Sequence, residues 1–162
     1  MKHLNTYITE YIIKKKLDKP IDSEDHCIYF PETKEELISN IKELFDKGKT
    51  DLNSIDTSKI TDMTHLFESF NNIENVNFDV SKWDVSNVKD MTCMFGNCVK
   101  FKGKGLENWN VSKAEYMIRM FIGCDNFTGE QIENWKIKKD CSKFEMLSNC
   151  KNIKNMPSWY EE

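Results

Sequence analysis

The sequence predicts an α/β repeat protein, built as a short solenoid of about four coils that are each 26 to 28 residues long. The main observation is that three apolar columns recur at a spacing of 26 residues, with a looser copy 28 residues upstream. The columns are Trp83, Trp109 and Trp135; Phe95, Phe121 and Leu147; and Cys98, Cys124 and Cys150, with Ile55, Phe67 and Phe70 as the upstream copy. Self-similarity of this length is typical of a solenoid, where each repeat buries its apolar side by stacking on its neighbours. We expect the repeat domain to occupy residues 49–153.

Two alternating patterns inside each repeat predict its local structure. The first pattern spaces three apolar residues by two positions and then one, as in Val80, Trp83, Val85; Leu106, Trp109, Val111; and Ile132, Trp135, Ile137. It matches the LxxLxL core of leucine-rich repeats, in which a short strand points alternate side chains inward. The second pattern has steps of three, three, one and three, as in Val88, Met91, Met94, Phe95 and Cys98. These steps predict one face of a short helix, so each coil of this leucine-rich-repeat-like solenoid should contain a short strand and a short helix.

Two segments precede the expected cap. Residues 1–19 are predicted to form an amphipathic helix, because apolar residues recur at helical spacing and Lys14 to Lys16 lie near its C-terminal end, where cations suit the helix dipole. Such a helix packs on its own protein or docks on a membrane or a partner, and both alternatives stay open. Residues 20–31, with Pro20 and a polar run, are expected to be a linker.

Both ends of the predicted stack have capping signals. Over residues 32–48, Thr33 and Glu36 have the spacing of a capping box, an apolar stripe follows, and Gly48 supplies a stop, which together predict a helix. This N-terminal helical cap would cover the first coil, whose apolar face would otherwise meet water. At the other end Pro157 interrupts a further strand pattern, so residues 154–162 are expected to form a C-terminal cap.

Composition and charge exclude several classes of function. The 162 residues include 23 basic and 27 acidic side chains, with a net charge of -4 and both signs spread along the chain, so we expect no nucleic-acid partner. No apolar run reaches the roughly 18 residues of a membrane span, and the opening residues lack the apolar region of a signal peptide. We therefore expect the chain in the cytoplasm of the producing cell, or in a virion, with its six cysteines as free thiols.

The column Cys98, Cys124 and Cys150 has two interpretations. Stacked thiols could bind a metal or oxidise, or they could supply the small apolar side chain that the column needs. We favour the structural role, because Phe70 fills the same column in the first copy. Paired CxxC or Cys/His spacings for zinc are absent, the three histidines stand far apart, and no phosphate-binding, nucleophile-elbow or metalloprotease motif occurs. We expect no metal, no cofactor and no enzymatic activity.

The outward positions of the predicted strands form two ladders that are candidates for partner binding. They comprise Asp56, Asp84, Asn110 and Lys136, and, two residues on, Ser58, Ser86, Ser112 and Lys138. A rigid strand face that presents different side chains in register is the usual binding surface of leucine-rich repeats. The alternative is that the Asp, Asn and Ser side chains cap the following helices or bridge to the next coil, and we favour this use for the Asp/Asn column.

Two stretches carry a resemblance to a known family. WDVSNVKDMTCMFGNC (residues 83–98) and IDTSKITDMTHLF (residues 55–67) resemble the repeats of the BspA-like leucine-rich-repeat surface-protein family, over about residues 51–153. The resemblance implies a leucine-rich-repeat-like solenoid with a role in adhesion or protein–protein contact, and it brings no catalytic motif. The opening MKHLNTYITEYI is also similar to the N-terminal segments of many proteins from tailed phages.

The sequence therefore predicts a non-enzymatic protein–protein interaction module of the leucine-rich-repeat type, with a protein partner. The alternative is a structural or packaged component of a phage particle, in which residues 1–17 serve as a docking tag.

Overall fold

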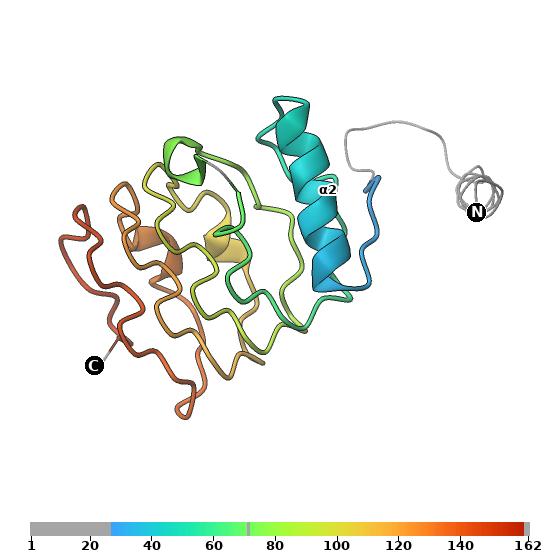
Figure 1. Cartoon of the computed structure of the whole chain (residues 1–162). Coiled ribbons are helices and arrows are strands. Elements are labelled where there is room, and N and C mark those ends of the chain that lie inside the picture. Colours follow the sequence, from blue (N-terminus) through green and yellow to red (C-terminus); the bar gives the residue numbers. More distant parts are fainter. Residues whose placement is uncertain (1–26, 71, 161–162) are drawn as a thin grey trace, which may run out of the picture.

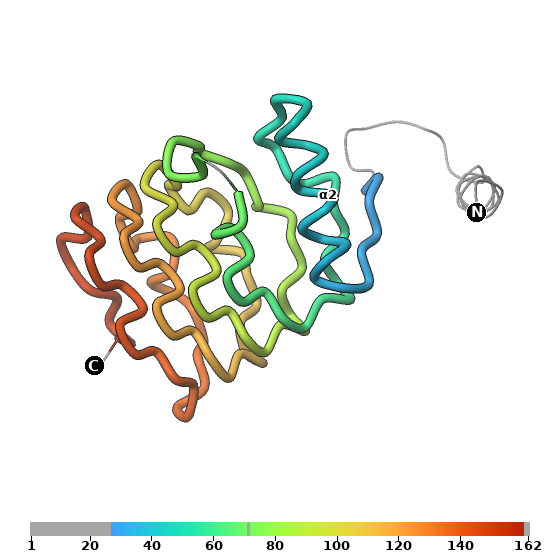
Figure 2. The backbone as a smooth tube through the Cα atoms, viewed as in Figure 1, coloured from blue at the N-terminus to red at the C-terminus, as the bar shows by residue number. Residues whose placement is uncertain are grey.

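In the computed structural model, which describes residues 27–70 and 72–160, the repeats lie side by side as a stack of irregular turns (Figures 1 and 2). The named elements are one α-helix, α2 (Lys34–Asp46), and three single-turn 3₁₀ helices, η1 (Ile73–Asn75), η2 (Leu106–Asn108) and η3 (Glu130–Ile132). Helix α2 lies at one end of the stack and the last repeat at the other. The predicted helix over residues 1–19, with the docking tag at 1–17, and most of the predicted linker at 20–31 lie outside the described residues.

The prediction of an α/β leucine-rich-repeat-like solenoid is wrong. Over residues 27–70 and 72–160 the structure contains no sheet, and α2 is its one α-helix. The repeats are connected by isolated parallel bridges rather than by strands: Tyr29 to Ile55, Asp51 to Asp79, Asp62 to Asp90, Asp90 to Tyr116, and Tyr116 to Ser142. Neither the strand nor the helix expected in each coil is formed.

The segment predicted as a helix is a run of hydrogen-bonded turns. In the second repeat the N–H groups of Met94, Gly96 and Cys98 each donate to the carbonyl three residues back, at 3.0–3.1 Å. The N–H groups between them, at Met91, Cys93, Phe95 and Asn97, donate instead to the next repeat, at 2.7–2.9 Å. Cys93 and Asn97 have φ of 53° and 59°, in the left-handed region that a right-handed helix excludes. Turns that span three residues place apolar side chains at the same spacing as a helix, which is why the pattern predicted one.

The segment predicted as a strand is also built on a turn. The backbone N–H of each repeat tryptophan donates to the carbonyl three residues earlier, at 3.1 Å for Trp83, Trp109 and Trp135. The indole N–H then reaches back to the preceding repeat, where Trp83 donates to the carbonyl of Leu52 at 3.0 Å and Trp109 to that of Val80 at 3.3 Å. The tryptophan column therefore both fills the core and connects consecutive repeats through a buried hydrogen bond.

Stacked aromatic rings form the centre of the core. Phe95 lies between Phe67 and Phe121, with ring centroids 5.4 and 5.3 Å away. The return loops supply a second aromatic column that the sequence interpretation missed, in which Phe101 stacks on Phe95 at 4.4 Å and Phe127 on Phe121 at the same distance. Because these rings are fully buried, the core extends beneath loops whose glycines and polar residues indicated only surface turns.

Helix α2 forms where its capping signals predicted. Thr33 is the N-cap, and its hydroxyl accepts a hydrogen bond from the N–H of Glu36 at 3.2 Å. The carboxylate of Glu36 accepts from the N–H of Glu32, at 2.7 Å, which satisfies a further free N–H ahead of the helix. The stripe of Leu37, Ile41 and Leu44 is buried against the first repeat, so α2 is part of the hydrophobic core.

Residues 154–160, part of the predicted C-terminal cap, follow the tryptophan side of the last repeat. The Trp159 indole donates to the carbonyl of Ile132 at 2.8 Å, which repeats the contact made by the earlier tryptophans. The N–H of Ser158 donates to the Glu133 carboxylate at 3.2 Å. No helix in the described part of the chain is long and apolar enough to cross a membrane.

Candidate functional site

The residues of the two predicted partner-binding ladders do not lie on a strand face. Several of their side chains stabilise turns instead. The side-chain oxygens of Asp56, Asp84 and Asn110 each accept a hydrogen bond from the N–H two residues on, that of Ser58, Ser86 and Ser112, at 3.0, 2.9 and 3.2 Å. These contacts are Asx turns, which fix the local backbone. Lys136 and Lys138, the last members of the two ladders, are exposed. Partner binding by these eight residues stays a prediction, but the strand face on which they were placed does not exist.

A different surface has the features of a binding site. We call it the turn face, and define it as the outward side of residues 62–68, 90–96, 116–122 and 142–148. Bridges hold these four segments in register, through Asp62, Asp90, Tyr116 and Ser142. Apart from Phe144, the Met, Leu and Phe side chains of the same segments point into the core and are buried. The turn face therefore presents outward side chains at fixed spacing on a rigid support.

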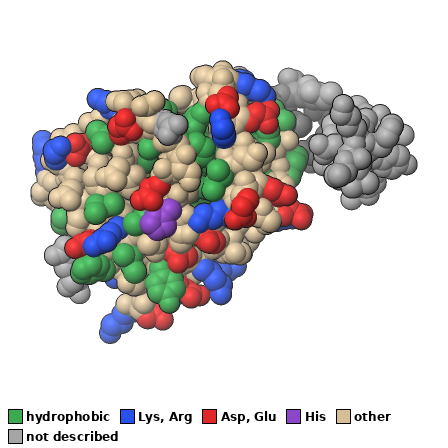
Figure 3. Space-filling view, in the orientation of Figure 1, with side chains coloured by type: hydrophobic (Ala, Val, Ile, Leu, Met, Phe, Trp, Pro, Cys, Tyr) green, Lys and Arg blue, Asp and Glu red, His purple; other side chains and the backbone are tan. Residues whose placement is uncertain are grey.

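The chemistry of the turn face changes along the stack. The first repeat presents Asp62, His65 and Glu68, all of them exposed. The later repeats present Tyr116 and Phe144, which are 46% and 63% exposed, although large apolar side chains are usually covered. Arg119 contacts the fourth repeat: its Nε donates to the Glu145 carboxylate at 2.6 Å, and its guanidinium lies 6.0 Å from the centre of the Phe144 ring. Figure 3 shows hydrophobic side chains and charges of both signs side by side on this surface.

Behind the turn face, backbone hydrogen bonds join each repeat to the next. We call these bonds the backbone ladder, and its two ends differ chemically. Each repeat donates backbone N–H groups to carbonyls of the following repeat, and the last such donors, Met117, Arg119, Phe121 and Gly123, bond to the fourth repeat at 2.8–3.0 Å. The equivalent N–H groups of the fourth repeat, at Lys143, Glu145, Leu147 and Asn149, have no hydrogen-bond acceptor within residues 27–70 and 72–160. An edge of backbone donors therefore borders the exposed Phe144 ring.

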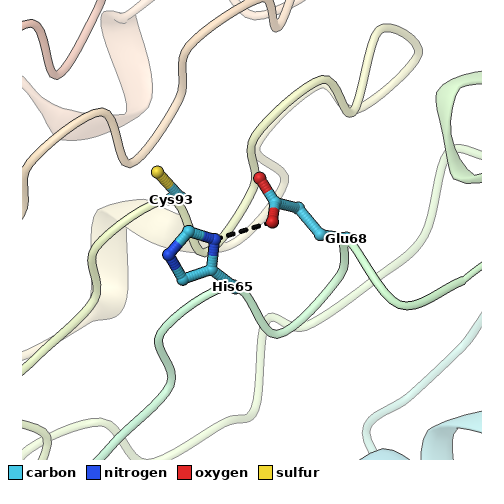
Figure 4. Close-up of side chains that lie close together, drawn as sticks. All are labelled: His65, Glu68 and Cys93. Atoms are coloured by element: carbon cyan, nitrogen blue, oxygen red, sulfur yellow. Dashed lines mark hydrogen bonds and ion pairs between the residues drawn. The ribbon is translucent and has the colours of Figure 1, made fainter.

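Three potential metal ligands meet where the first and second repeats adjoin. One ligand atom each from His65, Glu68 and Cys93 lies within 4.8 Å of the other two. Figure 4 shows the three side chains converging, with the His65 Nδ1 to Glu68 Oε2 contact at 2.6 Å. The Cys93 thiol is nearly buried, and burial, together with the negative charge of Glu68, raises its pKa.

Reasoning from the sequence missed this cluster, although a signal for it was present. The three histidines stand far apart in the sequence, and no short motif pairs any of them with Cys93. His65 and Cys93 are separated by 28 residues, the spacing between the first two copies of the repeat, so they occupy the same column. In a stacked repeat, residues of one column are neighbours, and comparing the columns would have placed the imidazole beside the thiol.

The column of Cys98, Cys124 and Cys150 has a structural role. Cys98 and Cys124 are fully buried, and the thiols of Cys124 and Cys150 donate to the carbonyls of Phe95 and Phe121 in the preceding repeats, at 2.9 and 3.0 Å. Burial raises the pKa of Cys98 to about 12 and that of Cys150 to about 11, so these thiols stay protonated at neutral pH. None of the six cysteines, all of which lie in the described part of the chain, forms a disulfide.

Comparison with known proteins identifies a family. Residues 37–160 match the family described as "Mycoplasma protein of unknown function, DUF285". Comparisons with the curated proteins and with the solved structures found no match.

Proposed function

This chain belongs to the DUF285 family, whose description leaves its function unknown, and we propose that it is a non-enzymatic module that binds another protein. The proposal agrees with the resemblance of residues 55–67 and 83–98 to BspA-like surface proteins, which implies adhesion or protein–protein contact. The binding surface is the later part of the turn face together with the edge of the fourth repeat.

The observation that supports this function best is the exposed Phe144 ring beside unfilled backbone donors. Phe144 is 63% exposed, and the N–H groups of Lys143, Glu145, Leu147 and Asn149 lack acceptors among the residues described. Backbone edges of this kind bind an added polypeptide segment through main-chain hydrogen bonds, while neighbouring apolar side chains provide specificity.

The ladder itself indicates what the partner must offer. In the three earlier repeats the N–H donors meet carbonyls at alternate positions of the neighbouring segment, for example those of Ser142, Phe144, Met146 and Ser148. We therefore expect an extended or turn-forming polypeptide segment that provides alternate carbonyls and an apolar side chain to cover Phe144. An exposed aromatic anchor covered in this way is the kind of residue that dominates binding energy at protein interfaces.

A capture experiment with two matched variants tests this function. The chain, Phe144→Lys and Ile28→Lys are each immobilised and exposed to a lysate of the source cells, and retained proteins are identified by mass spectrometry. Ile28 is also a highly exposed aliphatic residue, but it lies beside Ser54 at the α2 end of the stack. The wild-type chain and Ile28→Lys should retain the same protein, and Phe144→Lys should lose it, because a lysine cannot be covered by an apolar contact without a desolvation cost.

The same experiment discriminates between the two functions that the sequence predicted. A partner that Phe144→Lys retains, and that is lost when residues 1–17 are removed, would support docking through the N-terminal tag, as the phage-component alternative requires. A chain that retains no protein in any form would contradict the binding function.

A further inference from the structure

We propose that His65, Glu68 and Cys93 form a binding site for a divalent transition-metal ion of the zinc type. The three side chains offer a nitrogen, an oxygen and a sulfur atom that lie within 4.8 Å of one another. This inference goes beyond the proposed protein binding and uses different atoms, at the first and second repeats rather than at the edge of the fourth.

The backbone holds these ligands on two adjacent repeats. The N–H of His65 donates to the carbonyl of Thr92 at 2.9 Å, which places the His65 backbone directly beside Cys93. The N–H of Cys93 donates in turn to the carbonyl of Ile118 at 2.9 Å, and the N–H of Glu68 donates back to His65 at 3.2 Å. His65 and Cys93 also share the left-handed backbone conformation, with φ of 51° and 53°. Ligands on a support of this kind lose little freedom when a metal binds.

The observed separations are close to those of a tetrahedral site. Zn²⁺ binds His nitrogen at about 2.0 Å, carboxylate oxygen at about 2.1 Å and Cys sulfur at about 2.3 Å, which places tetrahedral ligand atoms roughly 3.5 Å apart. The 2.6 Å contact between His65 and Glu68 has to open by roughly 1 Å, and a separation as long as the 4.8 Å limit would have to close by roughly 1 Å. His65 and Glu68 have side chains that are 53% and 43% exposed, so both can move without disturbing the core.

The ligand set and the local charge select the class of ion. Imidazole and thiolate favour Zn²⁺ and Co²⁺, whereas Mg²⁺ and Ca²⁺ require oxygen ligands throughout. Binding releases the proton of the Cys93 thiol to solvent, and the resulting thiolate and the Glu68 carboxylate compensate the two charges of the metal ion. Arg119, the next residue of the His65 and Cys93 column, is engaged by Glu145 at 2.6 Å, so its positive charge is compensated as well. Three protein ligands leave the fourth position of a tetrahedral site to water.

Titration of the reduced full-length chain with Co²⁺ tests the site. We expect one Co²⁺ per chain, with the charge-transfer absorption of a thiolate–cobalt bond, and displacement of Co²⁺ by an equivalent of Zn²⁺. Cys93→Ser should abolish the absorption. His65→Ala and Glu68→Gln, at exposed positions, should weaken binding by roughly tenfold or more.

Two control variants separate this site from other thiols. Cys141→Ser removes another buried thiol, in the fourth repeat, and Cys27→Ser removes the thiol next to His26. Both should leave the absorption unchanged. Failure of stoichiometric Co²⁺ to produce the absorption, persistence of the absorption in Cys93→Ser, or unchanged affinity in His65→Ala would each overturn the proposal. Because His65→Ala changes an exposed side chain, its result does not depend on whether Cys93→Ser folds.

Discussion

The two ends of the stack differ in chemistry and in how they are covered. The backbone ladder has a direction in the turn-face segments: the N–H groups of Tyr116 and Ser142 donate back to Lys89 and Glu115, but the other N–H groups that join two repeats there donate to the following repeat. The first repeat therefore ends in carbonyls, at Asp62, Thr64 and Leu66, and the fourth ends in N–H groups. Helix α2 lies at the carbonyl end, where Lys34 contacts the side chains of Asp62 and Thr64. The fourth repeat has no such helix over its donors among the residues described.

Capping by a helix and binding of a partner are two ways to cover the backbone groups at the end of a stack. A ladder of backbone groups must be covered by the chain's own elements, satisfied by water, or paired with a partner. A helix has few free backbone groups on its sides, so α2 can cover the first repeat through apolar contacts of Leu37 and Ile41 and end the ladder there. The backbone N–H groups of the fourth repeat are uncovered, so they can form hydrogen bonds with another polypeptide.

Hydrogen exchange should reveal the largest contrast. We expect the N–H groups of Met117, Arg119, Phe121 and Gly123, inside the ladder, to exchange roughly a thousandfold or more slowly than those of Lys143 and Glu145, because protection inside a core approaches the global free energy of unfolding. Native-state exchange measured by NMR would give these rates residue by residue. Equal protection at both sets of groups would mean that something covers the fourth repeat, and the comparison between the ends would fail.

Truncation inside α2 should produce the next largest effect. Ile41 is fully buried, so Ile41→Ala should lower the free energy of unfolding by about 2–5 kcal/mol, through lost transfer free energy and the cavity left behind. Urea denaturation measures this change. Ile38→Ala is the matched control, because Ile38 is on the same helix but only half buried, and its loss should be smaller. A loss at Ile41 no larger than that at Ile38 would show that α2 does not seal the first repeat.

Several of these features were predictable from the sequence. The residues in the columns of Trp83, Phe95 and Cys98 are buried, and Cys150 is partly buried. They share this environment because a fixed repeat in sequence places equivalent residues at equivalent positions in the stack. Helix α2 was predictable from Thr33 and Glu36, because capping is local chemistry that acts within one turn of the chain.

The local structure of the repeats was not predictable from spacing alone. Steps of three fit both a helix and a succession of turns. Which of the two forms depends on hydrogen bonds between repeats, such as the one from the N–H of Met91 to the carbonyl of Tyr116, 25 positions away. A left-handed conformation at Cys93 is likewise stabilised by contacts between repeats, since no local signal such as glycine marks the position. The candidate metal site follows from the same contacts, because they bring His65 beside Cys93.

Removal of the α2 N-cap should have a moderate effect. Thr33→Ala should lower the free energy of unfolding by about 1 kcal/mol, because the N–H of Glu36 loses its acceptor. Thr33→Ser retains the hydroxyl and should stay close to the wild-type chain. Thermal unfolding followed by circular dichroism distinguishes the two variants. If Thr33→Ala leaves the free energy of unfolding unchanged, the capping box does not stabilise the end of the stack that α2 covers.

The smallest expected effect is a pH dependence confined to the α2 end. Partial burial alone would raise the pKa of Asp62, but hydrogen bonds from the N–H and hydroxyl of Thr64, with the charge of Lys34, outweigh it and lower the pKa. A carboxyl whose pKa is lowered by folding stabilises the protein above its unfolded pKa of about 3.9, and this contribution is lost as the pH falls through the folded pKa. Because the Asp62 side chain is 54% exposed, the contribution should be only about 0.2–1 kcal/mol.

Asp62→Asn isolates this contribution. The amide keeps an oxygen that can accept from the Thr64 N–H, which Asp62 binds at 2.7 Å, but it has no charge for Lys34. The free energies of unfolding of the variant and the wild-type chain should differ at pH 6. The difference should begin to shrink below about pH 4 and should disappear only when the pH lies below the lowered pKa of the folded Asp62 carboxyl. Lys34→Met should remove most of the difference at pH 6, because it deletes the partner charge. Two outcomes would contradict a role of the charge pair in holding α2 against the carbonyl end: a difference in free energy of unfolding that persists at low pH, or one that Lys34→Met leaves unchanged. In either case apolar burial of Ile41 and its neighbours alone would cover the first repeat.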